Sequence, residues 1–393
     1  MLTVAEYETY DAMGLAGLIA TKQTSVSEVL ETAISHVEAK NPVLNAVVHK
    51  MYDATRLTIS RALPVGPLAG VPFLIKDVGS YCKGARCGNG SRLFDGFIAE
   101  HDDTAIERYK AAGLVIIGRT NSSEFALAPA TEPVANGPTL NPWDHTRSAG
   151  GSSGGAAAAV AARMVPTAHA VDGGGSIRIP ASNCGLFGLK PTRARTPSGP
   201  LVGDGWAGGL VGHAVTRSVR DSAALLDAIA GPAPGEPHWA PPRERPFLEE
   251  VDVDPGQLRI AFTTKSPTGG EVHPECIAAA TNAAKLCTEL GYHIEEAAPS
   301  FDLTRMRWAR DVVISAWLRN EVDTRLEALG RSLRADDLER ITALQAQRGA
   351  GYSARDYARA LVILNGIRLQ FAAFFTGFDS SSTVSLLSAA RVG

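Results

Sequence analysis

The sequence predicts an α/β fold in which helices cover both faces of a β-sheet. Short apolar runs typical of strands alternate with helical segments along the chain. Hydrophobic residues make up 45% of the 393 residues, which is enough for a substantial core. The alternation continues beyond a proline-rich stretch, so we expect one domain rather than two.

The first 60 residues are predicted to be helical. Ser25 and Glu28 form a capping-box pattern at the start of one helix. Pro42 is expected to end this helix, and a second helix is expected around 51–63. One buried face of the first helix is predicted from apolar residues at three- and four-residue spacing, namely Val26, Val29, Leu30, Ala33, Ile34 and Val37.

The central part of the chain contains the clearest strands. A short buried strand is predicted at 71–75, and Lys76 and Asp77 follow it directly. The next predicted elements are a helix at 104–112, a strand at 114–117, a helix at 156–163, a strand at 167–171 and a helix that begins at Ser218 and ends near 229.

The C-terminal part begins after the proline-rich residues and is predicted to be αβ and then largely helical. We expect a strand at 258–262, a helix at 274–290, a strand at 293–296 and mostly helix over 303–377. The predicted single domain spans 1–379. It consists of N-terminal helices (1–65), a central core (66–231), a proline-rich connection (232–257) and the remaining αβ and helical part (258–379). A serine-rich, atypical tail without a completed element follows (380–393).

Composition narrows the class of protein. The net charge of −3 does not favour binding to nucleic acid or to an anionic membrane. The chain contains no apolar run of transmembrane length and no signal-peptide pattern at its start. Five scattered cysteines lack the spacing of a zinc site and are expected to be free thiols. These features predict a cytoplasmic protein that needs no metal.

Two serines, each surrounded by glycines, form the most informative pattern of the sequence. Ser152 lies within Gly150–Gly155, and Ser176 follows three consecutive glycines. A serine nucleophile needs a base, and its transition state needs hydrogen-bond donors for the developing oxyanion. The unobstructed amides of Gly173, Gly174 and Gly175 are candidate donors. The alternative is a glycine turn with an incidental serine.

Lys76 is the candidate base. It ends an apolar strand, and the carboxyl ends of strands face the site in α/β sheets. Burial would lower the pKa of Lys76 and make the neutral amine available. Ser152 would then pass the proton of Ser176 to Lys76.

Three alternatives to this arrangement remain. His145 and His169 are the histidines nearest to the serines, but neither has an obvious carboxylate to orient it. Lys76 would have no catalytic role if it were an exposed residue paired with Asp77. A phosphate-binding loop is disfavoured because no Gly-Lys-Ser/Thr follows the glycines.

The serine loops and their neighbours resemble the amidase signature family, which comprises serine amidases with a lysine, a cis-serine and a serine nucleophile. The resemblance extends from about residue 5 to about residue 379, and residues 131–231 resemble most the members that hydrolyse cyclic nylon oligomers. The matching motifs are Gly66–Asp77, Gly118–Phe125, Asn141–Trp143, Gly150–Gly155, Asp172–Ala181, Cys184–Gly185 and Gly188–Thr192.

This resemblance implies a mixed, twisted sheet sandwiched by helices, and it implies a role for each site residue. Ser176 would be the nucleophile, Ser152 the cis-serine that relays protons, and Lys76 the general base and acid. The implied oxyanion donors are the amides of Gly173, Gly174, Gly175 and Ser176. The implied supporting residues are Ser153, Asp172 and Arg178.

The implied function is hydrolysis of a carboxamide C–N bond through a serine acyl-enzyme, without metal or cofactor. The expected partner is a small-molecule amide, without nucleic acid or membrane, and a homodimer is one expected assembly. Two alternatives are an amidotransferase subunit that delivers ammonia to a partner and a truncated, inactive relic. Family members continue past this length, so the fold is expected to be C-terminally truncated. This expected truncation is the reason for considering an inactive relic.

Overall fold

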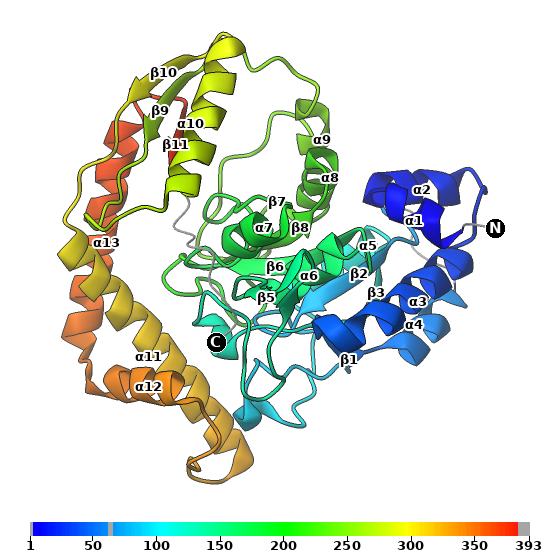
Figure 1. Cartoon of the computed structure of the whole chain (residues 1–393). Helices are drawn as coiled ribbons and strands as arrows, with labels where there is room; N and C mark the ends of the chain where they lie inside the picture. The colour runs from blue at the N-terminus through cyan, green and yellow to red at the C-terminus, as the bar shows by residue number, and fades with distance from the viewer. Residues whose placement is uncertain (1–2, 62–65, 384–393) are drawn as a thin grey trace. The chain divides into compact units, whose positions relative to one another are not determined.

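The computed structural model describes residues 3–61 and 66–383 (Figure 1). The chain forms two compact units. The first comprises the residues up to 251 together with 325–343, and the second comprises 252–324 and the described residues from 344 onward. This division into compact units does not test whether residues 1–379 form a single domain, which stays a prediction.

A mixed sheet forms the centre of the first unit. Its strands are β1 (Val47–Lys50), β2 (Pro72–Lys76), β3 (Val115–Thr120), β6 (Thr167–Asp172), β7 (Phe187–Gly188) and β8 (Val211–Thr216). They are arranged in the order β1-β3-β2-β6-β8-β7. β2 is parallel to both β3 and β6, whereas the pairs β1–β3, β6–β8 and β7–β8 are antiparallel. A separate two-stranded hairpin consists of β4 (Leu140–Asn141) and β5 (Asp144–Ser148).

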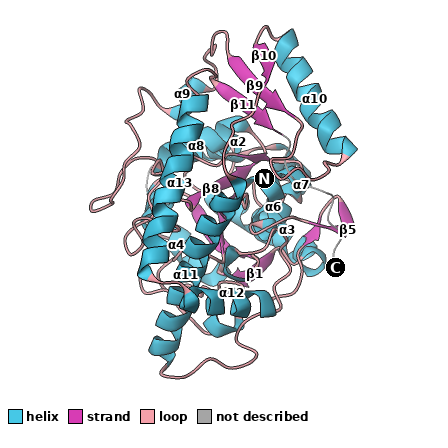
Figure 2. Ribbon diagram, turned by 90° about the vertical axis from the view of Figure 1, so that its left-hand side faces the viewer, coloured by secondary structure: helices cyan, strands magenta, loops and turns pink. Residues whose placement is uncertain are grey.

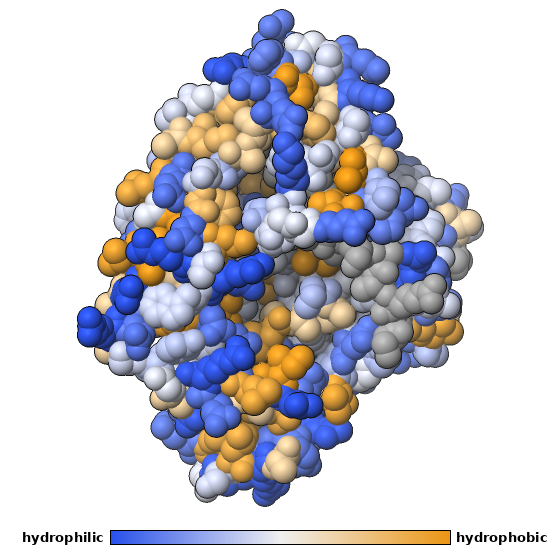
Figure 3. Space-filling model, turned by 60° about the vertical axis from the view of Figure 1, so that its left-hand side comes forward, coloured by the Kyte–Doolittle hydropathy of each residue, from blue (hydrophilic) through white to orange (hydrophobic). Residues whose placement is uncertain are grey.

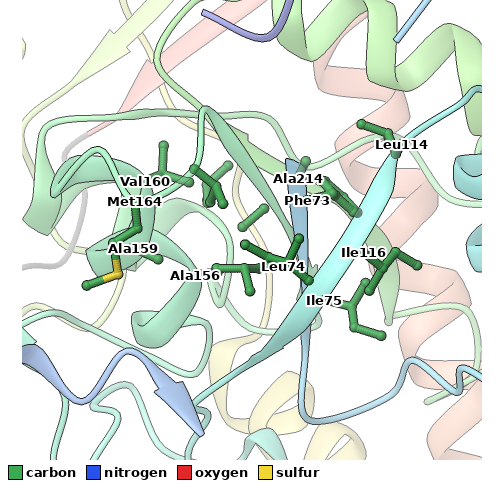
Figure 4. Packing of buried hydrophobic residues seen from close by; sticks show 14 of the residues in the cluster. Phe73, Leu74, Ile75, Leu114, Ile116, Ala156, Ala159, Val160, Met164 and Ala214 are labelled. Carbon is green, nitrogen blue, oxygen red and sulfur yellow. The ribbon is translucent and has the colours of Figure 1, made fainter. Parts of the chain in front are cut away.

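Helices cover both faces of the six-stranded sheet. Side chains alternate between the two faces along β2. Leu74 points toward Ala156 of α6 (Gly154–Ala161), as Figure 4 shows. Phe73 points to the opposite face, where its ring centroid lies 4.9 Å from that of Tyr109 in α5 (Thr104–Ala111). The predicted α/β fold, with a mixed sheet between helices, is therefore confirmed.

The remaining helices of the first unit follow the predicted order, with two additions, α7 (Arg178–Cys184) and α9 (Phe247–Glu250). A short helix, α9, lies within the proline-rich connection, where no element is predicted. These helices are α1 (Val4–Thr9), α2 (Ala12–Ala20), α3 (Val26–Leu44), α4 (Tyr52–Ile59), α7 (Arg178–Cys184), α8 (Val219–Ile229) and α9 (Phe247–Glu250), with 3-10 turns at Arg92–Phe94 and Glu124–Ala126.

Helix α3 confirms its predicted start but not its predicted end. The amide of Glu28 donates to the Ser25 hydroxyl at 3.2 Å, and the Ser25 amide donates to the Glu28 carboxylate at 2.9 Å. The helix continues through Pro42 to Leu44, so the prediction that Pro42 ends it is wrong. Proline has a helical φ and removes only one hydrogen bond in the last turn. Asn45 ends the helix instead, because its left-handed φ of 49° is a C-cap conformation.

The prediction that the first 60 residues are helical is also wrong at β1. This strand is only 4 residues long and pairs with the buried strand β3, so tertiary pairing outweighs local preference. Helix α4 confirms the predicted second helix but ends at Ile59. Residues 62 and 63, the last of that prediction, lie outside the described residues.

The second unit contains a parallel three-stranded sheet with helices. Figure 2 shows strands β9 (Arg259–Thr263), β10 (His293–Glu296) and β11 (Ser380–Thr383) side by side, in the order β10-β9-β11. Helix α10 (Pro274–Glu289) connects β9 to β10. The predicted helical region contains α11 (Leu303–Leu329), α12 (Arg340–Gly351) and α13 (Ala354–Phe374), of which α11 and α12 each extend into the first unit.

Strand β11 corrects the prediction that the tail from residue 380 contains no element. It pairs in parallel with β9, from Ser380 opposite Ile260 to Thr383 opposite Thr263. A polar segment can form a strand because the ladder uses backbone groups. Residues 384–393 of the predicted tail lie outside the described residues.

Apolar side chains also occur on the surface. Figure 3 shows one face on which apolar residues form several patches separated by hydrophilic ones. Ile341 on α12 and Val362 and Leu369 on α13 are among the exposed large apolar residues. Apolar atoms contribute about 55–60% of the accessible surface of folded proteins, so exposed apolar side chains are normal.

Candidate active site

Lys76 is the last residue of β2 and is completely buried. Its Nζ donates to the Oγ of Ser152 at 2.6 Å. Burial lowers the pKa of Lys76 to about 7, although the negative charge of Asp172 acts in the opposite direction. A lysine with this pKa is available as a neutral base near pH 7. The alternative of an exposed lysine paired with Asp77 is wrong in this structure.

Asp77 pairs instead with Arg119 of β3, which is also completely buried. Arg119 Nε donates to Asp77 Oδ1 at 3.0 Å. Arg119 Nη2 donates to the carbonyl oxygens of Lys76 at 2.9 Å and Ser80 at 2.7 Å. Buried charges are tolerated when they are paired and hydrogen-bonded, so this network fixes the backbone that carries Lys76.

The loop that carries Ser152 leads directly into α6 (Figure 1). The peptide bond between Gly151 and Ser152 is cis. Thr131 holds both sides of this loop, because its hydroxyl donates to the Gly150 carbonyl at 2.9 Å and accepts from the Gly154 amide at 3.0 Å. No role is predicted for Thr131, because nothing in its local sequence indicates its contacts with Gly150 and Gly154.

The glycines of this loop allow other backbone segments to approach closely. A Cβ added at Gly151 would lie 2.6 Å from the backbone nitrogen of Ala130. A Cβ added at Gly155 would overlap the backbone nitrogen of Asn121. Any side chain at these positions would therefore displace the backbone of a neighbouring segment.

We expect Gly155→Ala to lower the free energy of unfolding by about 2 kcal/mol or more, because overpacking against rigid backbone is costly. Gly17→Ala is the matched control. Gly17 lies in α2 with no atom within 4 Å of an added Cβ, so this change should raise stability by about 0.5–1 kcal/mol. Urea denaturation measures both variants. Equal stability of the two variants would contradict the close approach at Gly155.

Asp172 organises the loop that carries Ser176. Its buried carboxylate accepts hydrogen bonds from Arg178 Nε and Nη2, both at 2.9 Å. It also accepts from the amides of Gly175 at 2.7 Å and Ile177 at 3.2 Å. Burial alone would raise the pKa of Asp172, but these contacts outweigh burial and hold that pKa below its ordinary value. The loop is therefore built around a carboxylate that stays ionised.

The three glycines that are predicted to be oxyanion donors differ in the hydrogen bonds that their amides make. The amide of Gly175 donates to the carboxylate of Asp172 at 2.7 Å. Within residues 3–61 and 66–383, the amides of Gly173, Gly174 and Ser176 donate to no protein acceptor.

Ser176 is half-buried on the loop after β6. β2 and β6 are neighbouring parallel strands, so Lys76 and this loop lie at the same edge of the sheet. The Ser153 hydroxyl donates to the carbonyl of Val171 in β6 at 3.4 Å, which joins the two serine loops. In the described chain, no hydrogen bond links the Ser176 hydroxyl to Ser152 or Lys76. The structure thus joins Lys76 to Ser152 and puts Ser176 on the adjacent loop.

The two histidines considered as bases do not fit that role. His169 and Asp172 are three residues apart on β6, so their side chains point to opposite faces of the sheet. The centroid of the His169 ring lies 6.1 Å from that of Tyr109. Burial, reinforced by the charge of Lys76, lowers the pKa of His169 to about 3. His145 is exposed on β5.

Neither a metal cluster nor a membrane span is found in the described parts of the chain. Across residues 3–61 and 66–383, no group of three or more His, Cys, Asp or Glu side chains could hold a metal ion. No helix in the same ranges is long and apolar enough to cross a membrane.

Comparisons with known proteins identify the family. A family model described as Amidase matches residues 28–383. The chain is 39% identical over 355 residues to 6-aminohexanoate-cyclic-dimer hydrolase of Paenarthrobacter ureafaciens, and the match covers 88% of this chain and 71% of that protein. It is 36% identical over 293 residues to a glutamyl-tRNA(Gln) amidotransferase subunit of Syntrophobacter fumaroxidans, and this match covers 72% of this chain and 59% of that protein.

The solved structure of 6-aminohexanoate cyclic dimer hydrolase superimposes with a TM-score of 0.94 at 36% identity, over 98% of this chain and 81% of that one. The family match spans both serine loops and Lys76. The chain therefore belongs to the amidase signature family and is a hydrolase of amide bonds.

Proposed function

We propose that the protein hydrolyses carboxamides through a serine acyl-enzyme, with Ser176 as the nucleophile, Ser152 as the proton relay and Lys76 as the base. The hydrogen bond of 2.6 Å between Lys76 and Ser152 carries the proposal. A fully buried lysine whose pKa is lowered to about 7 can accept a proton at neutral pH. Its contact with a hydroxyl, rather than with a carboxylate, supports a role in proton transfer.

The reaction would proceed in two stages. Ser176 Oγ attacks the carbonyl carbon, its proton passes to Ser152, and the proton of Ser152 passes to Lys76. The C–N bond then breaks, and the leaving amine receives a proton by the reverse route. Water attacks the acyl-enzyme with the same relay, which releases the carboxylic acid and frees Ser176.

The oxyanion of each tetrahedral intermediate would accept hydrogen bonds from the amides of Gly173 and Gly174, with that of Ser176 as a further donor. These amides adjoin the nucleophile and donate to no acceptor within the described residues. The Asp172–Arg178 pair supports this role because it holds the loop that carries them. Preorganised donors of this kind contribute about 3–4 kcal/mol each to lowering the barrier.

Substrate preference is proposed from the relatives. Two proteins of 39% identity are named 6-aminohexanoate-cyclic-dimer hydrolases, so we propose amides that carry aliphatic chains as the substrate class. The test is incubation of the purified protein with the 6-aminohexanoate cyclic dimer and with simple carboxamides, followed by measurement of the released amine. Turnover of at least one of them by the protein alone is the expected result.

The similarity to an amidotransferase subunit favours a second candidate function, in which ammonia released at Ser176 passes to a partner protein. The same incubation distinguishes the two functions. Steady turnover without any added protein supports the stand-alone amidase. Glutamine hydrolysis that begins only when a partner protein is added would support the amidotransferase function.

The pH dependence follows from the pKa of Lys76. Its ordinary pKa of 10.5 is lowered to about 7 in the folded protein, so Lys76 is neutral above pH 7 and protonated below it. We expect kcat/KM to fall about tenfold per pH unit below pH 7 and to level off above it. A rate profile over pH 5–9 measures this. An activity that stays constant down to pH 5 would contradict the assignment of Lys76 as the base.

A further inference from the structure

A tryptophan side chain lies against the loop that carries the oxyanion donors. A Cβ added at Gly173 would lie 2.6 Å from both Cε3 and Cζ3 of Trp206, and the next nearest atom belongs to Leu210. The benzene ring of the indole therefore occupies the space where a side chain of residue 173 would lie. Trp206 is half-buried, so part of this residue remains accessible to solvent.

The backbone around Trp206 is held in an unusual conformation. Trp206 and Ala207 have φ values of 51° and 53°, a left-handed conformation that residues other than glycine rarely adopt. Arg193 Nη2 bonds both carboxylate oxygens of Asp204, at 3.0 and 3.2 Å, and so ties this loop to the chain that follows β7. Strained residues persist where the surroundings enforce them, often at functional sites.

We propose that Trp206 is a specificity-determining residue that forms one wall of the acyl pocket and favours amides with an apolar acyl chain. This inference rests on the proposed function. A substrate carbonyl oxygen that accepts from the amides of Gly173 and Gly174 lies against this loop. The first carbons of the acyl chain are bonded to the same carbonyl carbon, so they would extend along this loop toward the ring beside Gly173.

The chemistry of the ring determines what it selects. An indole face buries methylene groups well and offers no acceptor or charge for a polar chain. One methylene in an apolar pocket changes kcat/KM by about 10- to 200-fold. The ring should therefore favour hexanamide over acetamide, because acetamide carries only a methyl group next to its carbonyl.

The test compares hexanamide and acetamide as substrates for the wild-type protein and for Trp206→Ala. We expect the ratio of their kcat/KM values to fall at least about tenfold in Trp206→Ala. The loss should appear mainly in KM for hexanamide, while kcat for acetamide changes little. Trp206→Phe, which keeps an aromatic face, should give an intermediate ratio. The matched control is Trp239→Ala, which removes a tryptophan that is 66% exposed and should leave the ratio unchanged.

An unchanged ratio in Trp206→Ala would overturn the inference while the proposed function stands, provided that the variant turns over acetamide and unfolds at the wild-type temperature. If Trp206→Ala fails to fold, Trp206→Phe decides the question by the same ratio. If the wild-type protein hydrolyses no amide and a fluorophosphonate does not label Ser176, the proposed function fails and the inference fails with it.

Discussion

Ser176→Ala is expected to lower kcat by at least about four orders of magnitude and to abolish labelling by a fluorophosphonate probe. The remaining protein keeps its oxyanion donors but cannot form an acyl-enzyme, and removal of a serine nucleophile has effects of this size in other hydrolases. The side chain is half-buried and makes no hydrogen bond within the described residues, so the free energy of unfolding should change by less than about 0.5 kcal/mol.

Ser182→Ala is the matched control for this variant. Ser182 is exposed on α7, a few residues after Ser176, and has no proposed role. It should keep wild-type turnover and labelling. Labelling that persists in Ser176→Ala, or that disappears in Ser182→Ala, would show that the nucleophile is another residue.

Lys76→Met is expected to lower kcat by about 10²- to 10⁴-fold, with a small change in KM, because it removes the base and keeps the volume of the side chain. The variant should not be less stable than the wild type below pH 7. Burial lowers the pKa of Lys76 to about 7, so the unfolded chain binds its proton more tightly than the folded protein does. The cost of burying the charged Lys76 amine opposes folding at low pH, and this cost is relieved as the pH rises from about 7 to 10.5.

Lys110→Met is the control for loss of a lysine. Lys110 Nζ lies 2.7 Å from Asp102, and its side chain is 39% exposed, so the ion pair contributes little to stability. This variant should keep its kcat. A drop in kcat of the same size in both lysine variants would show that the effect of Lys76→Met is not specific to a base.

Much of the fold could be predicted because local patterns and tertiary structure agree. The capping box of Ser25 and Glu28 and the apolar run before Lys76 appear where they are predicted. The prediction that Pro42 ends its helix is wrong because a proline in the last turn removes only one hydrogen bond, which costs the helix little stability. Strands β1, β7 and β8 are not predicted, since each is short or lacks a clear period, and each depends on pairing with a distant strand.

The residues of the site also fall into those that could be predicted from the sequence and those that could not. Lys76 and the glycine–serine loops could be found from the sequence, since their residue types and their order along the chain indicate the chemistry. Thr131 and Arg119 could not, because their contacts with the Ser152 loop and with Asp77 join segments that are far apart in the sequence. The direction of the Gly175 amide is likewise a property of the folded loop, which the run of three glycines does not reveal.

The roles of Ser176 and Lys76 are tested together by the rate of fluorophosphonate labelling as a function of pH, with the modified residue identified by peptide mass spectrometry. We expect an adduct on Ser176, and a labelling rate that rises with an apparent pKa of about 7 in the wild type. In Lys76→Met the rate should be much lower and should lose this rise. An adduct on another residue, or the same pH dependence in Lys76→Met as in the wild type, would contradict these roles.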